Sequence, residues 1–401
     1  MSNIYAALEI GTTRTVLAIG ETDGNGRLKV TCHADIPSTG VRKSQILDIH
    51  QATHSIKSVL QQIERKQSEA GSKIIVGNAF LAISGQHIKA DPYTVSTQIG
   101  NARVGDDEIN QVLRAAHSMP LPKDRELLDI IDQDYTIDRL GGISAPKGMS
   151  GNILRLNTLQ IHADANRIQD ARTAADAAHL EIREPLFSAT CAADAVLEAH
   201  EKKRGALVVD LGGGSTGYTV YSDGYVVSTG VIGVGGDHIT NDIAHAFQTT
   251  NAQAEGIKVN EASALVGAND DSRPRVKVEQ GENTLMDNRT ISRRSLNTIV
   301  NARVMELFTV LRETLVEQDI LQRLHAGVVL TGGGAQLRDI QAVAGQALGA
   351  TVRIGRPLQV DGLEDVPFPA AYATIVGCLL YAQRNYEDKS ILNSIIGRFF
   401  K

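Results

Sequence analysis

A strand–turn–strand pattern with an acid before a glycine turn occurs twice in this chain and constrains its fold more than any other feature. In Gly205–Gly230, a Val-rich run ends at Asp210, and the turn Leu211–Thr216 (LGGGST) leads into two further strand-like runs. In Ile4–Gly20, a similar apolar run ends at Glu9 and turns through a glycine and two threonines. Short apolar runs of this kind are typical of buried strands. Two such hairpins, about 200 residues apart, predict a duplicated lobe.

The chemistry available at these turns is that of phosphate and magnesium binding. Glycines leave backbone N–H groups open to a phosphate, and a carboxylate at a strand end can hold a hydrated Mg²⁺. For one turn alone, a tight hairpin with an exposed acid is the alternative, but the repetition favours two hairpins that clamp a nucleotide across a cleft. The candidate phosphate-binding residues are Gly11, Thr12, Thr13, Asp210, Gly212, Gly213, Gly214, Ser215 and Thr216, and the candidate metal-binding residues are Glu9 and Asp210.

A third glycine turn and a glycine pair extend the candidate site. Thr331–Ala335 (TGGGA) follows another buried-strand pattern, and Gly235–Gly236 precedes an expected helix, Asp237–Phe247. Glycines at a helix N-terminus offer free N–H groups to an anion. Glu255 and Lys258 share a helix face, where they form either a solvated ion pair or part of the site. The added candidates are Gly235, Gly236, Glu255, Lys258, Gly332, Gly333, Gly334 and Gln336.

These turns together resemble the actin-like ATPase superfamily and, within it, the FtsA family of bacterial cell division proteins. The segment between the hairpins carries the most specific resemblance, in RELL at 125–128, QDYTID at 133–138 and PKGMSG at 146–151. The resemblance implies an α/β fold: a two-lobed, actin-like (duplicated, ribonuclease H-like) ATPase with an α+β insert of the FtsA type and a C-terminal amphipathic helix. It also implies ATP and Mg²⁺ as ligands.

The resemblance divides the chain into parts with expected roles. The insert would contact neighbouring subunits and later division proteins, and the outer subdomain would bind the C-terminal tail of FtsZ. There, Arg293, Arg294 and Arg303 suit an acidic peptide, or they are solvated helix charges. The expected parts are the first lobe (1–84, continued at 166–203 and 365–388), the insert (85–165), the second lobe (204–255, continued at 327–364), the outer subdomain (256–326) and a membrane-targeting helix (389–401).

The resemblance also implies roles around the nucleotide. Residues similar to Glu255 and Lys258 flank the adenosine in the superfamily, and the third glycine turn would pass under the adenine. Glu184 resembles an acid that orients the attacking water, although its neighbour Pro185 would fix a turn between two helices whether or not catalysis occurs. Glu9 stands where the superfamily usually has Asp, and its longer arm shifts the metal or its water, which affects hydrolysis more than binding.

The last thirteen residues, KSILNSIIGRFFK (389–401), form the second decisive pattern. On a helix, the large apolar side chains fall on one half and the cationic ones on the other, which suits an interfacial membrane helix; docking on the protein's own surface is the alternative. Six half-buried apolar side chains contribute roughly 6–9 kcal/mol, which the ordering of about ten residues offsets. One copy therefore binds weakly, and a polymer of many copies binds tightly. The apolar residues are Ile391, Leu392, Ile395, Ile396, Phe399 and Phe400.

Composition excludes several classes and sets the expected compartment. The net charge of −6, without a basic block, argues against nucleic acid as a partner. The scattered Cys32, Cys191 and Cys378 lack metal-ligand spacing and fit a reducing compartment. The chain shows no signal peptide and no apolar run of the roughly 18 residues that a membrane span requires. We therefore expect a cytoplasmic protein, and the resemblance implies that it is peripheral on the inner face of the cytoplasmic membrane at the division site.

The predicted function is that of an ATP-binding division protein that polymerises and anchors the FtsZ ring to the membrane. Any ATP hydrolysis would be slow transfer of a phosphoryl group to water. One rival is a small-molecule kinase of the same superfamily, which needs a catalytic Asp between the lobes for which the sequence offers no candidate. The other is a PilM-like pilus assembly ATPase, which lacks a terminal membrane helix.

Overall fold

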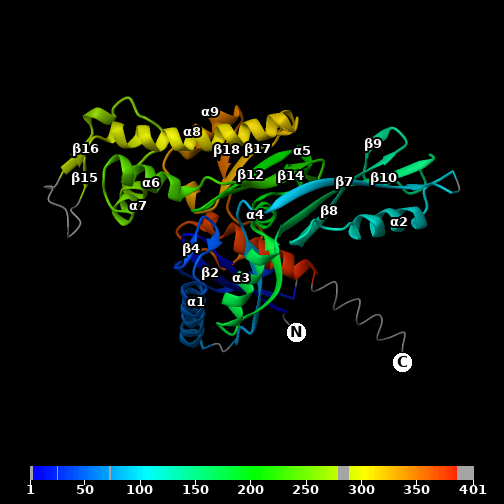
Figure 1. Ribbon diagram of the computed structural model, residues 1–401, viewed down its shortest axis with the longest axis horizontal. Coiled ribbons are helices and arrows are strands. Elements are labelled where there is room, and N and C mark those ends of the chain that lie inside the picture. Colours follow the sequence, from blue (N-terminus) through cyan, green and yellow to red (C-terminus); the bar gives the residue numbers. More distant parts are fainter. Residues whose placement is uncertain (1–2, 25, 72–73, 101, 279–288, 386–401) are drawn as a thin grey trace.

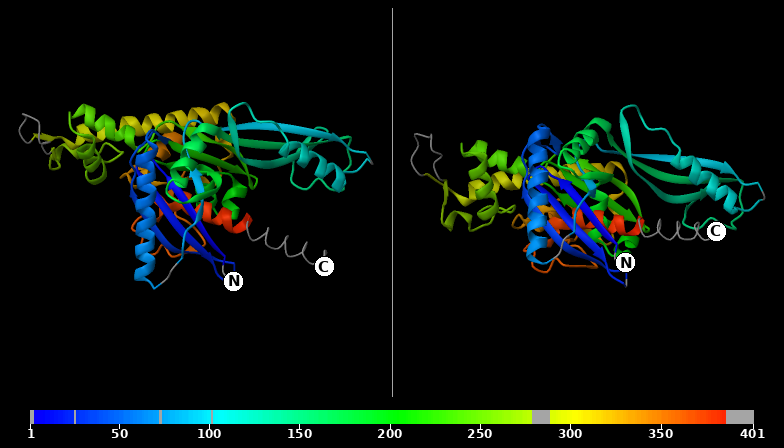
Figure 2. Two further views of the ribbon diagram at one scale, coloured as in Figure 1. Left: turned by 60° about the horizontal axis from the view of Figure 1, so that its bottom comes forward. Right: turned by 90° about the horizontal axis from the view of Figure 1, so that it is seen from below.

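Two β-sheets and the helices around them form the body of this protein in the computed structural model, which describes residues 3–24, 26–71, 74–100, 102–278 and 289–385 (Figure 1). Each sheet has helices on its outer face, and two helices lie between the sheets. The layers therefore run helix, sheet, helix, sheet, helix. An insert projects from one side of this body, and a long helix reaches the opposite end (Figures 1 and 2).

The first sheet is built around the hairpin that carries Glu9. In sheet order its strands are β11 (Glu181–Phe187), β6 (Asn78–Ile83), β1 (Ile4–Ile10), β2 (Arg14–Thr22), β3 (Leu28–Pro37) and β19 (Val360–Asp361). β1 pairs antiparallel with β2 and parallel with β6, so Glu9 lies at the end of a central strand. Helices α1 (Ile49–Glu69) and α3 (Ala165–Asp176) cover the outer face with apolar side chains.

The second sheet repeats this arrangement around Asp210. In sheet order its strands are β14 (Tyr225–Ile232), β13 (Thr216–Ser222), β12 (Ala206–Leu211), β17 (Gly327–Thr331) and β18 (Val352–Ile354). The antiparallel run β12–β13–β14 matches β1–β2–β3, and β17 pairs parallel with β12 as β6 does with β1. The predicted duplication is therefore present. The outer face is covered by α6 (Gly236–Ala246), α7 (Asn251–Asn260), α8 (Arg293–Glu317) and α9 (Ile340–Leu348).

The layer between the sheets consists of α4 (Ser188–Val196) and a helix over residues 373–385. Apolar side chains of both sheets pack against these helices in one core. The helices touch backbone to backbone, because a Cβ on Gly377 would lie 1.9 Å from the carbonyl oxygen of Cys191. Any side chain at Gly377 would therefore push the two helices apart.

The insert is an α+β unit with a small core of its own. In sheet order its strands are β7 (Lys89–Gln98), β10 (Ile153–Asp164), β8 (Arg125–Ile137) and β9 (Leu140–Ile143). Helix α2 (Asp106–His117) packs on this sheet and begins with three acids, which complement the helix dipole. The insert extends away from the body beside the second sheet (Figure 1).

The outer end of the second lobe is formed by α8 and the small sheet of β15 (Val276–Val278) and β16 (Arg289–Ile291) (Figure 1). Much of α8 belongs to the core of the second lobe, since its buried apolar side chains pack with those of the second sheet. The expected boundary between the second lobe and the outer subdomain, at 255/256, falls inside α7. The described apolar residues on both sides of this boundary pack in one core with the second sheet.

Two segments between the lobes differ from the sequence pattern. The pattern predicts a turn before α4, but Glu181–Phe187 forms strand β11, because it pairs in parallel with β6 at the edge of the first sheet. The sequence pattern also predicts a single helix over 188–202, and this prediction is wrong. The backbone is extended at Leu197 and Glu198, and the Glu198 N–H is capped by Glu201 at the start of α5 (Ala199–Arg204).

The segment after the third glycine turn also differs from expectation. The sequence pattern predicts that a helix begins near Gln336. This prediction is wrong, because Gly333–Gln336 forms only the short 3-10 turn η3. The following α9 starts at Ile340, after Asp339 with a left-handed φ of 62°. Gln336 thus remains beside the turn, facing the space between the lobes.

Candidate functional site

A cavity of about 370 Å³ lies between the two lobes, where the turns of both hairpins meet. Most of the residues selected from the sequence line it. They are Glu9, Gly11, Thr12, Thr13, Asp210, Gly212, Gly213, Gly214, Ser215, Gly236, Glu255, Lys258, Gly332, Gly333, Gly334 and Gln336. Two others lie behind the lining: Thr216 donates to the Val234 carbonyl at 2.7 Å, and Gly235 packs under the second turn, where a Cβ would be 2.4 Å from the Gly213 oxygen. We call this cavity the cleft.

The two hairpin turns have the same backbone geometry and face each other across the cleft. In the first, the Gly11 N–H donates to a carbonyl three residues later at 3.0 Å, and the second closes in the same way at Gly212, at 3.1 Å. A Cβ on Gly213 would lie 2.0 Å from Oγ1 of Thr13. Only glycine permits this approach, which leaves N–H groups and hydroxyls of both lobes beside one space.

The acid at the end of each central strand lines the cleft. Burial raises the pKa of Glu9 to about 7 and that of Asp210 to about 6, although Arg14 nearby lowers both. Among the residues that the structure describes, neither carboxylate forms an ion pair within 4 Å, and Asp210 accepts a hydrogen bond from Thr374 at 3.0 Å. Two unpaired acids beside a cavity are an environment that a bound cation would stabilise.

The same acids fit magnesium rather than a metal held by the protein alone. The described part of the chain contains no cluster of three or more His, Cys, Asp or Glu side chains suited to a metal ion. Mg²⁺ commonly takes only one or two carboxylates and fills its other positions with water and substrate phosphates. Glu9 and Asp210, facing turns suited to phosphate, match that requirement.

The far end of the cleft combines an ion pair with apolar side chains. Lys258 Nζ lies 2.7 Å from Oε2 of Glu255 and 2.9 Å from Oγ1 of Thr240, and it donates to the first carbonyl of α6 at 3.2 Å. The i,i+3 pair is therefore formed, and both its members also line the cleft. Val259, which is 67% exposed, and Leu337 add apolar surface suited to a flat ring.

A serine that sequence analysis did not select connects the two lobes. Ser44 lies in the turn between the short strands β4 (Val41–Arg42) and β5 (Gln45–Ile46), with a left-handed φ of 58°. Its N–H donates to Oγ1 of Thr12 at 2.8 Å, and its hydroxyl lies 2.9 Å from that of Ser215. The backbone conformation of this turn brings Ser44 to the cleft, and no local sequence motif indicates that position. Other lining residues missed from the sequence are Arg14, Ser84, Ser188 and Thr374.

Glu184 does not line the cleft. It lies in β11, and its Oε1 accepts a hydrogen bond from the Tyr381 hydroxyl at 2.9 Å. The residue that enters the cleft from this part of the chain is Ser188, the first residue of α4. Orienting a water for attack requires contact with the cleft, which this position of Glu184 does not provide.

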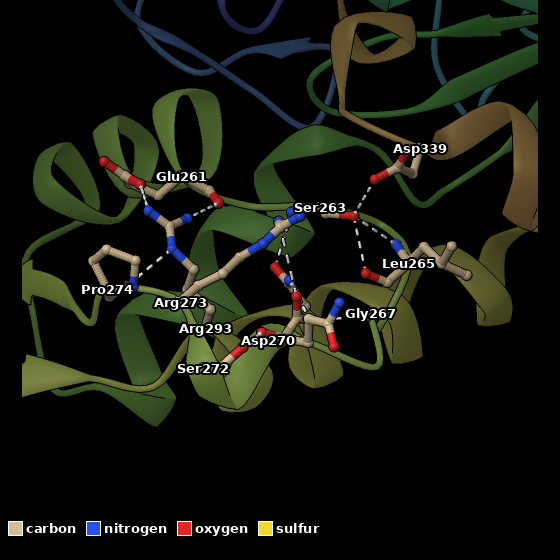
Figure 3. Close-up of polar contacts among 12 residues, drawn as sticks. Glu261, Ser263, Leu265, Gly267, Asp270, Ser272, Arg273, Pro274, Arg293 and Asp339 are labelled. Atoms are coloured by element: carbon tan, nitrogen blue, oxygen red, sulfur yellow. Dashed lines mark hydrogen bonds and ion pairs between the residues drawn. The ribbon is translucent and has the colours of Figure 1, made fainter.

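Arg293, a candidate for partner binding, is engaged within the chain (Figure 3). Its guanidinium donates to the Glu261 carbonyl at 3.0 Å, to the Glu261 carboxylate at 2.5 Å and to the Pro274 carbonyl at 3.0 Å. Beside it, the buried carboxylate of Asp270 accepts from the Gly267 N–H at 2.8 Å. This polar network fixes the loop that precedes α8 (Figure 3).

The other two candidate arginines are also paired. Arg303 makes two hydrogen bonds to Asp242, at 2.6 and 2.9 Å, with its side chain 26% exposed. Arg294 contacts Asp271 at 2.5 Å, but here the side chains are 44% and 63% exposed. Arg294 is therefore the most accessible of the three, since the Arg293 side chain is only 17% exposed.

The predicted membrane residues, within 389–401, lie outside the described residues. The described part of the chain stops at residue 385, within a helix that begins at residue 373. In the part of the chain that is described, no helix combines the length and apolarity needed to cross a bilayer.

Known proteins similar in sequence are cell division proteins. The family model for "Cell division protein FtsA" matches residues 207–377, and the model for "SHS2 domain inserted in FTSA" matches residues 85–162. The cell division protein FtsA of Pseudomonas aeruginosa is 32% identical over 389 residues, which covers 96% of this chain and 90% of the relative. That of Escherichia coli K12 is 30% identical over 392 residues, covering 96% and 91%.

Solved structures with a similar fold are actin-like proteins. The PilM–PilN type IV pilus biogenesis complex matches with a TM-score of 0.65 at 17% identity, covering 94% of this chain and 98% of that one. MreB5 of Spiroplasma citri bound to ADP matches with a TM-score of 0.54 at 14% identity, covering 96% and 98%. These likenesses, with the matched insert, confirm the predicted actin-like fold; its C-terminal helix lies outside the described residues.

Proposed function

Because this chain belongs to the FtsA family of cell division proteins, we propose that it binds ATP with Mg²⁺, assembles into a filament and anchors the FtsZ ring to the cytoplasmic membrane. A role in cell division follows from the family itself. The observation that carries the nucleotide proposal is the cleft, where two duplicated glycine turns, two unpaired acids and a third glycine turn converge.

The cleft suggests how ATP would be held. The phosphates would lie between the two hairpin turns, Gly11–Thr13 and Gly212–Ser215, with Arg14 supplying positive charge. Mg²⁺ would bind near Glu9 and Asp210 and neutralise phosphate charge. The base would lie toward the third glycine turn and the apolar surface on α7. An actin-like structural neighbour, MreB5, is itself bound to ADP, which supports a nucleotide as the ligand class.

Hydrolysis of ATP would be slow in this arrangement. Phosphoryl transfer depends mainly on positioning and on stabilising charge, and the turns and the cation would supply both. Glu184, the acid predicted to orient the attacking water, does not line the cleft, because its carboxylate is bonded to Tyr381. We therefore propose nucleotide binding and assembly, rather than turnover, as the main activity.

Membrane attachment is proposed from the apolar and cationic pattern of residues 389–401. A helix of this length binds lipid weakly as a single copy. A filament that presents many copies binds far more tightly, since each later contact is intramolecular. Nucleotide-dependent assembly and membrane attachment would therefore depend on each other.

The two projecting parts are the proposed partner surfaces. The outer subdomain would receive the FtsZ C-terminal tail, with Arg294 as its most accessible candidate cation. The insert, which matches a domain found within FtsA proteins, would contact neighbouring subunits and later division proteins. Its described residues have a small hydrophobic core of their own.

Co-sedimentation with liposomes tests the proposal directly. The full chain and a variant truncated after residue 388 would each be mixed with vesicles containing anionic lipid, with and without Mg-ATP. We expect the full chain to pellet with vesicles when Mg-ATP is present. The truncated variant should remain in the supernatant while still binding nucleotide.

The outcomes separate the parts of the proposal. Pelleting that ignores the truncation would exclude residues 389–401 as the anchor. Pelleting that needs the tail but is unaffected by nucleotide would separate attachment from assembly. Failure of the full chain to bind Mg-ATP at all would overturn the assignment of the cleft.

A further inference from the structure

Thr374 supplies the hydrogen bond to the acid of the second lobe. It lies in the helix over 373–385, between the two sheets, and its side chain is 4% exposed. Its hydroxyl donates to Oδ2 of Asp210 at 3.0 Å, and Thr374 also lines the cleft. We propose that Thr374 is a positioning residue for the magnesium site: it holds the Asp210 carboxylate in the orientation that binds the hydrated cation. This inference rests on the proposed nucleotide function.

The surroundings of Asp210 show why one hydroxyl matters. No cation among the described residues forms an ion pair with this carboxylate, so the Thr374 hydroxyl is the polar contact that fixes its orientation. On the other side, the Asp210 Oδ1 atom lies close to the third glycine turn, where a Cβ on Gly332 would be 2.4 Å away. The carboxylate is therefore confined between a glycine and a donor. A hydroxyl bonded to one oxygen leaves the remaining lone pairs for a cation or its water.

The segment that leads into Thr374 is held by contacts to both lobes. Four residues before Thr374, the Ala370 carbonyl accepts from Oγ1 of Thr331 at 2.9 Å and from the Gly332 N–H at 3.1 Å, both in the second lobe. The Ala371 carbonyl accepts from the guanidinium of Arg14, in the first lobe. One turn after Thr374, the close contact of Gly377 with α4 sets the position of the helix along its axis. The hydroxyl therefore reaches Asp210 from a rigid support.

The same helix links the proposed magnesium site to β11 and to α4. Near its other end, the Tyr381 hydroxyl donates to Glu184 at 2.9 Å, and Arg384 pairs with Asp194 of α4. A cation that engages Asp210 also stabilises the carboxylate orientation that Thr374 bonds. Binding of Mg-nucleotide should therefore increase the protection of amides in 373–385 from hydrogen exchange, and it should do so only when the hydroxyl is present.

The test separates magnesium-dependent from magnesium-independent nucleotide binding. The full chain, Thr374→Val, Thr374→Ser and Thr53→Val would be titrated with a fluorescent ATP analogue, in Mg²⁺ and in EDTA. Thr53 is the matched control, a buried threonine that donates to the Ala174 carbonyl outside the cleft. Valine keeps the shape of threonine but cannot donate, and serine keeps the donor.

We expect Thr374→Val to lose about tenfold in affinity in Mg²⁺, the size of one hydrogen bond to a charged group, and little in EDTA. Thr374→Ser should restore the affinity, and Thr53→Val should match the unmodified chain. The magnesium-dependent protection of 373–385 should disappear in Thr374→Val and return in Thr374→Ser. Thr374→Ala gives the same comparison if the valine variant fails to fold.

Two results would overturn the inference alone. One is an unchanged dependence on Mg²⁺ in a folded Thr374→Val protein, and the other is an equal loss in Mg²⁺ and in EDTA, which would reduce Thr374 to a part of the pocket wall. A full chain that binds no nucleotide in either condition would overturn the proposed function and this inference together.

Discussion

The charged side chains selected from the sequence include unpaired acids in the cleft and paired arginines in the outer subdomain. In the cleft, burial raises the pKa of Glu9 and Asp210, and neither forms an ion pair with a residue that the structure describes. In the outer subdomain, Arg293 and Arg303 are held by carboxylates at 2.5 and 2.6 Å. Both regions carry residues selected from the sequence as ligand-binding candidates, yet their surroundings differ in kind.

The difference shows how to tell a ligand site from a structural one. A buried acid without a partner costs folding free energy, so a chain retains it where a ligand supplies the missing charge. A paired arginine instead stabilises its own loop, and a partner can use it only after the pair is broken. Mutations should therefore affect ligand binding in the cleft and stability in the outer subdomain.

The largest expected effect follows from Asp210→Asn. Magnesium-dependent binding of a fluorescent ATP analogue should weaken by more than about 100-fold, roughly 3 kcal/mol, because the amide brings no charge to the cation. The free energy of unfolding in urea should not decrease, since a half-buried negative charge is removed. Asp365→Asn, at an exposed acid, is the control and should leave both quantities unchanged. Unaltered nucleotide affinity in folded Asp210→Asn protein would refute the assignment.

The second prediction tests whether an unpaired acid outside the cleft also marks a ligand site. Asp129, in β8, is half-buried near Glu184, Asp194 and Asp132, and burial raises its pKa to about 6 from 3.8. A raised pKa in the folded state means that Asp129 contributes full stability below about pH 4 and loses it as pH rises through 6. Asp129→Asn should therefore stabilise the protein by about 2 kcal/mol at pH 8 and hardly at pH 4.

Urea unfolding at both pH values measures this effect, again with Asp365→Asn as control. The same stabilisation at pH 4 and pH 8 would rule out the charge of Asp129 as its cause. A ligand or partner that binds beside Asp129 and offsets the free-energy cost of its charge would make Asp129 a second ligand site of the kind seen in the cleft. Without one, Asp129 is a half-buried acid that the junction of insert and body tolerates.

What the sequence could predict was determined by local pattern. Each hairpin carries its acid, glycines and hydroxyls within about ten residues, so the strand pattern alone places Asp210 at the end of a strand and Gly212–Ser215 in the turn. The duplication then implied that two such turns face each other. The resemblance to FtsA, which rests on short sequence stretches in the insert, is confirmed by the family matches.

What the sequence could not predict depends on contacts between distant segments. Ser44 enters the cleft because two residues with positive φ turn a hairpin toward the second lobe, and Thr374 enters because Gly377 fixes its helix against α4. The prediction that Glu184 lies in the cleft was wrong because its position, too, depends on contacts between distant segments. Parallel pairing of β11 with β6, about 100 residues earlier, makes its segment a strand and directs the carboxylate to Tyr381.

The third prediction sharpens the other side of the comparison. Arg303→Ala should destabilise the protein by about 1–2 kcal/mol, because it removes two hydrogen bonds to Asp242 and leaves that acid partly buried without its partner. Nucleotide affinity should not change. Arg312→Ala, an exposed position on the same helix, is the control in urea unfolding. Comparable losses in the two variants would assign the effect to the helix rather than to the pair.

The smallest effect on stability is expected at Arg294, whose side chain is exposed enough to contact a partner. Its contact with Asp271 is exposed on both sides, so Arg294→Ala should change the free energy of unfolding by less than about 0.5 kcal/mol. If the outer subdomain receives an acidic peptide, the same change should weaken the binding of an FtsZ C-terminal peptide severalfold, measured by fluorescence anisotropy, and more so at low salt. Arg312→Ala should bind the peptide normally. Equal peptide affinity in all three proteins would remove Arg294 from the proposed surface and leave the outer arginines with structural roles alone.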